Sequence, residues 1–154
     1  MHIAVLDENI ADRKQLERLL DRESDRRIST SGNLFVDSFG AAESLFVTPK
    51  LYDFFMIDIE GPGSACVELT KRIRAEGIPV PVCILRNESE FEGIEDIPEN
   101  VLFLEKPVKV ADLTATIDKC LQIWEEKRDE FVTPKDEEVP VKKNIFRRIF
   151  EYFY

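Results

Sequence analysis

Short runs of apolar residues alternate along the chain with longer stretches in which apolar residues recur every three or four positions. The short runs predict buried strands, and the longer stretches predict amphipathic helices. Predicted strands cover residues 3–6, 34–39, 54–57, 80–85 and 101–104. Predicted helices begin near residue 10, cover residues 41–46, run from the Gly61-Pro62-Gly63 breaker to Gly77, and cover residues 110–127. The alternation predicts an α/β fold, a doubly wound five-stranded parallel sheet with flanking helices, in one domain at residues 1–127.

Charged residues follow three of the five predicted strands. Asp7 and Glu8 come after the first strand, Asp58 ends the third, and Lys106 comes after the fifth, followed by Pro107. In a parallel sheet of this kind the carboxyl ends of the strands meet at one edge, where ligands bind. We therefore expect these side chains to converge there.

The carboxylates of such a cluster would repel one another, by roughly 4 kcal/mol for a pair about 4 Å apart at an effective dielectric constant of about 20. Either a raised pKa of one carboxylate or a bound cation would relieve this repulsion, and an all-oxygen cluster of this kind suits Mg²⁺, which prefers carboxylate and water ligands. Lys106 would add a second positive charge beside Asp58. Because a metal ion and an ammonium group neutralise the transferring oxygens when a carboxylate attacks a phosphoryl group, the pattern favours phosphoryl chemistry at Asp58.

Composition excludes several classes of protein. The chain has 31 acidic residues against 21 lysines and arginines, a net charge of −10, which argues against nucleic acid as a partner. No apolar run reaches the roughly 18 residues of a membrane span, and the first residues do not form a secretory signal. Cys66, Cys83 and Cys120 have no metal-binding spacing, so we expect reduced core thiols in a cytoplasmic protein. His2 is the only histidine, which excludes histidine-based triads and metal sites.

The order and spacing of these features resemble the receiver domain of two-component response regulators over residues 1–124. The residues that carry the resemblance are the acidic pair Asp7-Glu8, Asp58 at the end of FFMID, Pro62 four residues later, the segment VELTKRIRAEGIPVPVCIL, Lys106-Pro107, and the aromatic Phe103 three residues before the lysine. The resemblance implies a flavodoxin-like fold. It also implies a signalling module and not an enzyme, one that assists its own phosphotransfer and dephosphorylation.

The resemblance implies a role for each site residue. Asp58 would accept a phosphoryl group from a histidine kinase or a histidine phosphotransfer protein. Mg²⁺ would be held by Glu8, Asp58 and the backbone carbonyl of Glu60, with Asp7 acting through water. Lys106 would contact a phosphoryl oxygen, and a cis peptide bond to the proline that follows it would fix the geometry of the lysine.

Arg86 departs from the family pattern, which has Thr or Ser at the end of the fourth strand. In the family, that hydroxyl bonds the phosphoryl group and carries the switch toward the aromatic position, here Phe103. The planar fork of an arginine binds carboxylate or phosphate through two hydrogen bonds. Three orientations stay open: Arg86 clamps phosphorylated Asp58, pairs with unmodified acids in place of a cation, or points into solvent.

A second departure lies between residues 87 and 105, where the family has a fourth helix. Seven acidic residues and no basic residue occupy this segment, and Ile97-Pro98 limits regular helix near its end. We expect a short, irregular or mobile helix here. Signalling or dimerisation would then use another surface.

The end of the chain differs in character from the domain before it. Residues 128–143 are polar and predict a linker, and residues 144–154 predict an amphipathic C-terminal helix with basic residues in and just before it. A helix this short needs a surface to cover its apolar stripe. Docking within the chain or across a homodimer is favoured over a membrane surface or a partner's groove. The segment is too short for an ordinary output domain.

Three functions from different classes stay open. The favoured one is a stand-alone receiver that is phosphorylated on Asp58 and signals through protein contacts. The second is a pseudo-receiver, an interaction module whose pocket is locked by Arg86. The third is a Mg²⁺-dependent phosphodiester enzyme of the toprim kind, suggested by the acid after the first strand and by Asp58-x-Glu60, but it leaves Lys106 and Pro62 unexplained.

Overall fold

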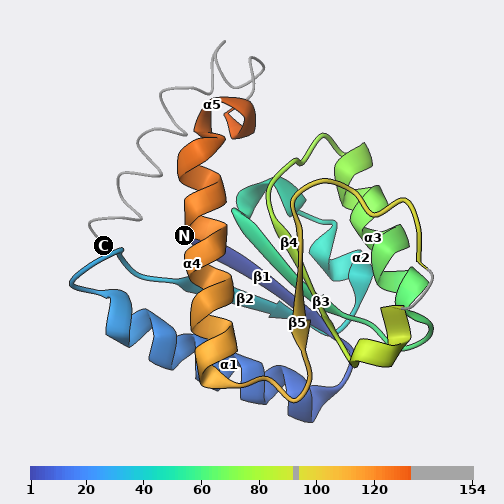
Figure 1. The fold of residues 1–154 in the computed structure, drawn as a ribbon, viewed down its shortest axis with the longest axis horizontal. Helices are drawn as coiled ribbons and strands as arrows, with labels where there is room; N and C mark the ends of the chain where they lie inside the picture. Colours follow the sequence, from blue (N-terminus) through green and yellow to red (C-terminus); the bar gives the residue numbers. More distant parts are fainter. Residues whose placement is uncertain (92–93, 133–154) are drawn as a thin grey trace.

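The five apolar runs form five parallel strands, and the predicted α/β fold is confirmed (Figure 1). The computed structural model describes residues 1–91 and 94–132. The strand order in the sheet is β2-β1-β3-β4-β5. The strands begin and end within two residues of the predicted positions, and they are β1 (His2–Asp7), β2 (Phe35–Phe39), β3 (Phe54–Asp58), β4 (Val82–Arg86) and β5 (Val101–Glu105).

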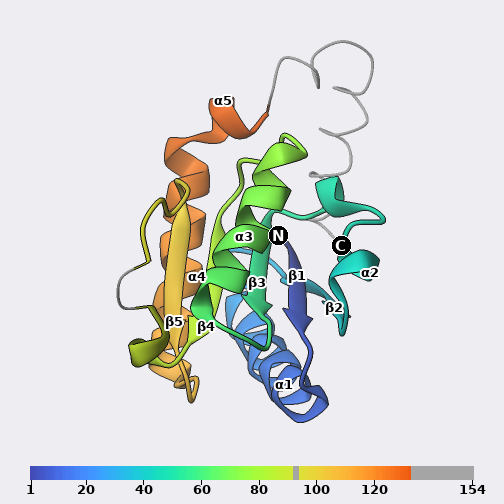
Figure 2. The same ribbon diagram turned by 90° about the vertical axis from the view of Figure 1, so that its right-hand side faces the viewer.

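Helices cover both faces of the sheet. One face carries α1 (Ile10–Arg27) and α4 (Val110–Glu126), and the other carries α2 (Ala42–Leu45) and α3 (Gly63–Ala75), as Figure 2 shows. A 3₁₀ turn, η1 (Pro49–Leu51), precedes β3. Among the described residues, no helix has both the length and the apolar character that crossing a membrane requires.

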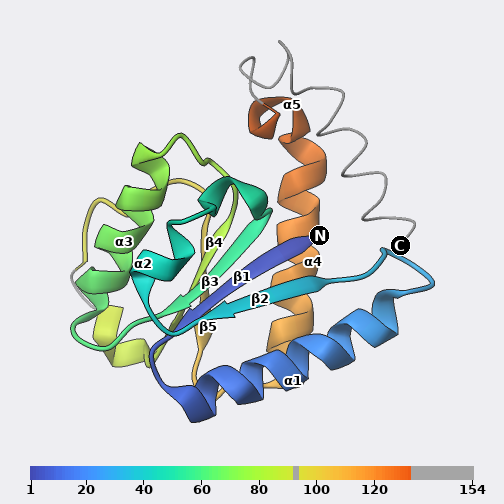
Figure 3. The same cartoon turned by 180° about the vertical axis from the view of Figure 1, so that it is seen from behind.

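The core lies on both sides of the three central strands. Nearly every residue of β1, β3 and β4 is buried, which explains why their sequences are continuously apolar and do not alternate. The edge strand β2 is only half-buried, and Figure 3 shows it from the side opposite to that in Figure 1. All three cysteines are buried free thiols, as predicted.

The segment between β4 and β5 differs most from a regular α/β unit. A 3₁₀ turn, η2 (Glu88–Phe91), stands where a helix would follow β4, and the described residues 94–100 contain no helix. The turn packs on the first residue of α3, since a Cβ atom on Gly63 would collide with the backbone carbonyl of Glu90. Within the described residues, the prediction of a short, irregular helix is confirmed.

The folded domain extends beyond residue 127. A short helix, α5 (Arg128–Phe131), follows α4, and Phe131 packs edge-on against Trp124 with ring centroids 4.7 Å apart. Phe131 is 5% exposed, so a buried aromatic residue lies at the start of the segment for which the sequence predicts a linker. The rest of the predicted linker and the C-terminal helix lie outside the described residues.

Candidate functional site

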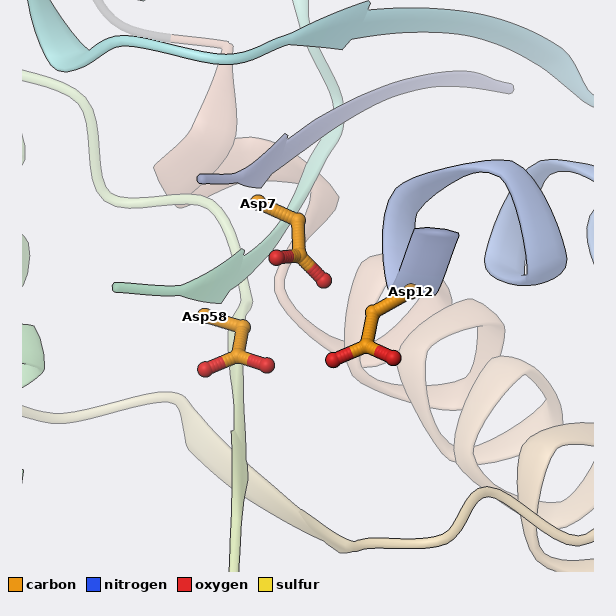
Figure 4. Close-up of side chains that lie close together, drawn as sticks. All are labelled: Asp7, Asp12 and Asp58. Atoms are coloured by element: carbon orange, nitrogen blue, oxygen red, sulfur yellow. The ribbon is translucent and has the colours of Figure 1, made fainter. Parts of the chain in front are cut away.

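Three aspartates from two strands and one helix point into a common space (Figure 4). Asp7 is the last residue of β1 and Asp58 the last of β3, and the two are partners in the strand register. Asp12 lies in the first turn of α1. One carboxylate oxygen from each residue lies within 4.8 Å of the other two. The parallel register therefore brings together two of the predicted acids, and α1 adds a third.

The start of α1 holds this cluster in place. Asn9 caps the helix, and its Oδ1 accepts a hydrogen bond from the backbone N–H of Asp12 at 3.0 Å. The backbone N–H of Asn9 in turn donates to Asp7 Oδ1 at 2.9 Å. Arg13 donates from its guanidinium to the backbone carbonyl of Asp7 at 2.8 Å. Two hydrogen bonds thus join the strand end to the helix start, and a third caps the helix.

The environment of Asp7 disfavours its charged form. The pKa of Asp7 is raised from 3.8 to about 6, chiefly by burial and also by the charges of Asp58 and Asp12, against the lowering effect of the hydrogen bond from the Asn9 N–H. Lys106 acts in the opposite direction but with a smaller effect. A carboxyl group in this state gains from a nearby cation, because the cation stabilises the ionised form.

Lys106 provides the positive charge that the strand pattern predicted. Its ammonium forms an ion pair with Asp58 and lies 3.9 Å from Asp12. Burial opposes the charged form, but the hydrogen bond and charge of Asp58, with the charges of Asp12 and Asp7, raise the pKa of Lys106. The Lys106-Pro107 peptide bond is cis, as the resemblance predicted.

The cluster lines a cavity of about 120 Å³ between α1, the strand ends and the start of the segment after β5. Its polar wall consists of the three aspartates and Lys106, with Gln15 beside them. Its other wall is apolar, and the residues are Leu16, Leu19, Leu85, Pro107 and Val108. A cavity with acidic side chains, one ammonium group and an apolar wall can hold a small charged group that is part of a larger molecule.

Glu8 and Glu60 were predicted to join the acidic cluster, but the carboxylates that gather within 4.8 Å of one another are those of Asp7, Asp12 and Asp58. Glu8 is exposed, and its Oε1 accepts a hydrogen bond from the backbone N–H of Glu60 at 3.1 Å. The sequence analysis did not identify Asp12 as a site residue. The spacing of Asp12 from Asn9 could have indicated its place, because a side chain three residues after the N-cap turns back toward the start of the helix.

Arg86 lies over the ring of Phe103, with its guanidinium carbon 4.7 Å from the ring centroid. Arg86 pairs with Glu105 in the strand register and Ile84 pairs with Phe103, so the arginine and the ring are diagonal neighbours on adjacent strands. None of the three predicted orientations included this stack. The long side chain of Arg86 reaches the face of the Phe103 ring on the neighbouring strand, and the spacing of the two residues in the sequence does not indicate this contact.

Sequence comparison finds response regulators, and no family model matches. Two-component response regulator ARR6 of Arabidopsis thaliana is 31% identical over 143 residues, which cover 80% of this chain and 70% of that protein. ARR5 of the same plant is 29% identical over 146 residues, 81% of this chain and 73% of that protein. The transcriptional regulatory protein FixJ of Bradyrhizobium diazoefficiens is 30% identical over 125 residues, 79% of this chain and 57% of that protein.

Solved structures with the same fold are receiver domains. The CheY-like response regulator receiver domain from Methylobacillus flagellatus matches 78% of this chain and 98% of its own, with a TM-score of 0.60 at 17% identity. The chemotaxis protein CheY4 of Vibrio cholerae matches 77% of this chain and 97% of its own, with a TM-score of 0.58 at 17% identity. The 31% sequence identity to ARR6 and the shared fold together show that this chain belongs to the two-component response regulators and contains a receiver domain.

Proposed function

We propose that this receiver accepts a phosphoryl group on Asp58 from a histidine kinase or a histidine phosphotransfer protein and signals through protein contacts. The observation that carries the proposal is the pairing of the Asp58 carboxylate with the Lys106 ammonium at the cavity. The Asp58 side chain is 15% exposed, so it is accessible to a small group while most of its surface is held by neighbours. An oriented carboxylate beside a fixed cation is suited to nucleophilic attack on phosphorus.

In the proposed step, one oxygen of Asp58 attacks the phosphorus of a phosphohistidine. The new O–P bond forms as the P–N bond breaks, and the imidazole nitrogen keeps the electron pair and takes up a proton. Lys106 neutralises negative charge on the transferring oxygens and orients Asp58 before the attack. The acyl phosphate is then hydrolysed by water, which returns the Asp58 carboxylate and releases phosphate.

The acidic cluster fits Mg²⁺, because three carboxylate oxygens lie within 4.8 Å of one another and all of the donors are oxygen. Asp7 and Asp58 would hold the ion, with Asp12 nearby, and the resemblance adds Glu8 and the backbone carbonyl of Glu60. When bound, Mg²⁺ would neutralise phosphoryl oxygens during the transfer. The hydrogen bond from the backbone N–H of Glu60 to the carboxylate of Glu8 holds these two residues beside each other.

An exposed apolar rim beside the cavity supports a protein as the phosphodonor. Ile10 at the start of α1 is 65% exposed, and Val110 at the start of α4 is 41% exposed. Val110 and Leu19 line a hollow of about 420 Å³ between α1 and α4, and Leu19 also lines the acidic cavity. Apolar side chains exposed beside a reactive group are typical of protein interaction surfaces. We infer that the phosphohistidine protein docks here.

The pseudo-receiver alternative receives less support. It requires Arg86 to lock the cavity, whereas the Arg86 guanidinium lies over Phe103 and β4 contributes Leu85 to the cavity wall. The toprim-like alternative needs Glu60 to act with Asp58, and the described contact of Glu60 is its backbone N–H to Glu8. The ion pair between Lys106 and Asp58, which that alternative leaves unexplained, is central to the receiver chemistry.

Labelling with a small phosphodonor tests the proposal. The full chain, incubated with acetyl phosphate and Mg²⁺, should gain one phosphoryl group, seen as an acid-stable, alkali-labile mass increase. Chelation of Mg²⁺ should abolish the gain, and so should Asp58→Asn. Asp21→Asn, an exposed position on α1, is the matched control and should be labelled like the unmodified chain. A folded chain that gains no phosphoryl group, or an Asp58→Asn variant that still gains one, would overturn the proposal.

A further inference from the structure

One face of the edge strand β5 is less covered than the other. β5 pairs with β4 and forms one end of the sheet (Figure 2). Leu102 and Leu104 are buried, whereas Val101 and Phe103 are only half-buried and Glu105 is exposed. Because side chains alternate along a strand, the buried pair lies on one face of β5 and the other three residues lie on the opposite face. We call this opposite face, with Val101, Phe103 and Glu105, the open face of β5.

The described part of the connection from β4 to β5 provides no regular helix to cover the open face. It contains the 3₁₀ turn η2, and residues 94–100 are not helical. In an α/β sheet the helix between two parallel strands normally packs on the sheet. Ile97 in the connection is 40% exposed, and the Arg86 guanidinium covers only one part of this face, the ring of Phe103. The open face therefore keeps apolar surface on which a helix could pack.

The surroundings of the open face are strongly acidic. Residues 87–105 contain seven acidic residues and no lysine or arginine. The side chains of Glu95, Asp96 and Glu105 are exposed, and none of them forms an ion pair with another described residue. A segment that is both apolar and basic would match this surface in both respects.

The end of the same chain has this composition. Residues 142–154 contain four basic residues and one acidic residue. A helix over residues 144–154 would carry one apolar stripe, formed by Ile145, Phe146, Ile149, Phe150 and Phe153. Eleven residues of helix span about 16 Å, and the five residues of β5 span about 17 Å. The predicted C-terminal helix thus fits the open face in length, apolar character and charge.

The end of α4 lies beside the start of β5, so the linker can reach the open face. The Nζ of Lys127 donates a hydrogen bond to the Oδ1 of Asn100 at 3.1 Å, and Asn100 directly precedes β5. Residues 133–143 can extend over about 36 Å, roughly twice the length of β5. A short linker also gives the helix a millimolar effective concentration at its own domain, which favours docking within one molecule over docking on a second copy.

The hollow between α1 and α4 is a poorer place for this helix. Arg22 and Arg26 line the hollow, together with one acidic residue, Asp25. A basic segment would meet a net positive charge there and a net negative charge at the open face of β5. Charge therefore distinguishes between the two surfaces.

We propose that residues 144–154 form a helix that packs on the open face of β5 in the same molecule. The apolar stripe of the helix lies against Val101 and Phe103, and its basic residues lie beside the exposed acids of the connection. The open face is then closed to a second copy of this chain, and a partner protein would have to displace the helix to bind there. The proposal does not depend on phosphorylation of Asp58.

A spin label at the last residue tests the position of the helix in the full chain. Tyr154→Cys, which lies outside the apolar stripe, can carry a nitroxide selectively because the three native cysteines are buried. We expect the backbone amide NMR signals of residues 95–105 to lose most of their intensity. The signals of α2 should keep theirs, because α2 contacts β1 and β2 at the other end of the sheet.

Charge reversal tests why the helix binds there. Arg147→Glu with Arg148→Glu should abolish the loss of intensity, because like charges would then face each other. Glu95→Lys with Glu105→Lys, added to that variant, should bring the loss back. Lys14→Glu with Arg18→Glu, at exposed positions on α1, makes the same change in net charge and should leave the loss unchanged.

A mixture of two samples shows whether the contact lies within one molecule. Chains that carry the nitroxide but no ¹⁵N, mixed with ¹⁵N-labelled chains without the nitroxide, should cause no loss of intensity. A loss in this mixture would show that the helix packs on a second copy and would overturn the proposal. Loss at the hollow between α1 and α4 instead of residues 95–105, no loss in a folded chain, or equal loss after the Arg147 and Arg148 reversal would also overturn it. Each of these results would leave the proposed function intact, because no phosphodonor is present.

Discussion

Asp7 and Asp58 face each other as register partners at the carboxyl ends of β1 and β3. The strand pairing fixes the separation of their backbones, so neither carboxylate can move far from the other without loss of sheet hydrogen bonds. Their repulsion is built into the fold. The ion pair between Lys106 and Asp58 and the hydrogen bond from the Asn9 N–H to Asp7 offset this repulsion. A bound divalent cation would offset it further.

Asp7→Asn should make the metal-free protein more stable at neutral pH. The folded-state pKa of Asp7 is raised to about 6 from 3.8, so between these values the folded state binds more protons than the unfolded state. The free energy of unfolding therefore falls as the pH rises through this range, and the full cost is present above about pH 6. The substitution should add about 3 kcal/mol at pH 7.5 and almost nothing near pH 4. Urea unfolding at the two pH values, with Mg²⁺ chelated, measures the difference.

Asp21→Asn on the exposed surface of α1 is the control for that experiment and should leave the stability unchanged at both pH values. A stabilisation by Asp7→Asn of the same size at pH 4 and pH 7.5 would show that the charge of Asp7 is not its cause.

Lys106→Met should slow phosphorylation of Asp58 by about a hundredfold, because the variant lacks the cation that neutralises the transferring oxygens. The rate is measured with acetyl phosphate at saturating Mg²⁺. Lys109→Met removes an exposed ammonium three residues further along the chain and should keep the normal rate. Equal rates for the two variants would remove Lys106 from the mechanism.

Gly63→Ala should destabilise the domain by about 1–3 kcal/mol, since the added methyl group meets the backbone carbonyl of Glu90 and the side chain of Ile94. Ser64→Ala, at the exposed neighbouring position, should change the free energy of unfolding by less than about 0.5 kcal/mol. Denaturant unfolding of the pair checks this. If Gly63→Ala were as stable as Ser64→Ala, the close packing of η2 on α3 would be wrong.

Phe131→Ala should cost about 3 kcal/mol, because its ring is buried against Trp124 at the end of the domain. Val47→Ala truncates a residue that is 77% exposed and should have almost no effect on the thermal midpoint. Were the two variants to melt at the same temperature, the domain would end before α5.

Parallel topology explains why so much of the site could be predicted from the sequence. Once the apolar runs are taken as parallel strands, Asp7, Asp58 and Lys106 must lie at one edge of the sheet, wherever they stand in the chain. This argument needs only the order of elements and the residue after each strand.

The parts that could not be predicted depend on geometry within and between elements. Asp12 enters the cavity because the Asn9 cap sets the rotation of the first turn of α1. Arg86 has several rotamers that reach different partners, and its contact with Phe103 depends on the register of β4 and β5. Phe131 is one apolar residue among charged neighbours, and its burial follows from the position of Trp124.

The position of the phosphoryl group can be identified directly by chemical reduction. Borohydride reduces an acyl phosphate to an alcohol, so a phosphorylated aspartate becomes homoserine, and peptide mass spectrometry then identifies the modified position. After treatment of the full chain with acetyl phosphate and Mg²⁺, we expect homoserine at residue 58. Homoserine at Asp7 or Asp12, or an unreduced Asp58 in a folded chain saturated with phosphodonor and metal, would contradict it.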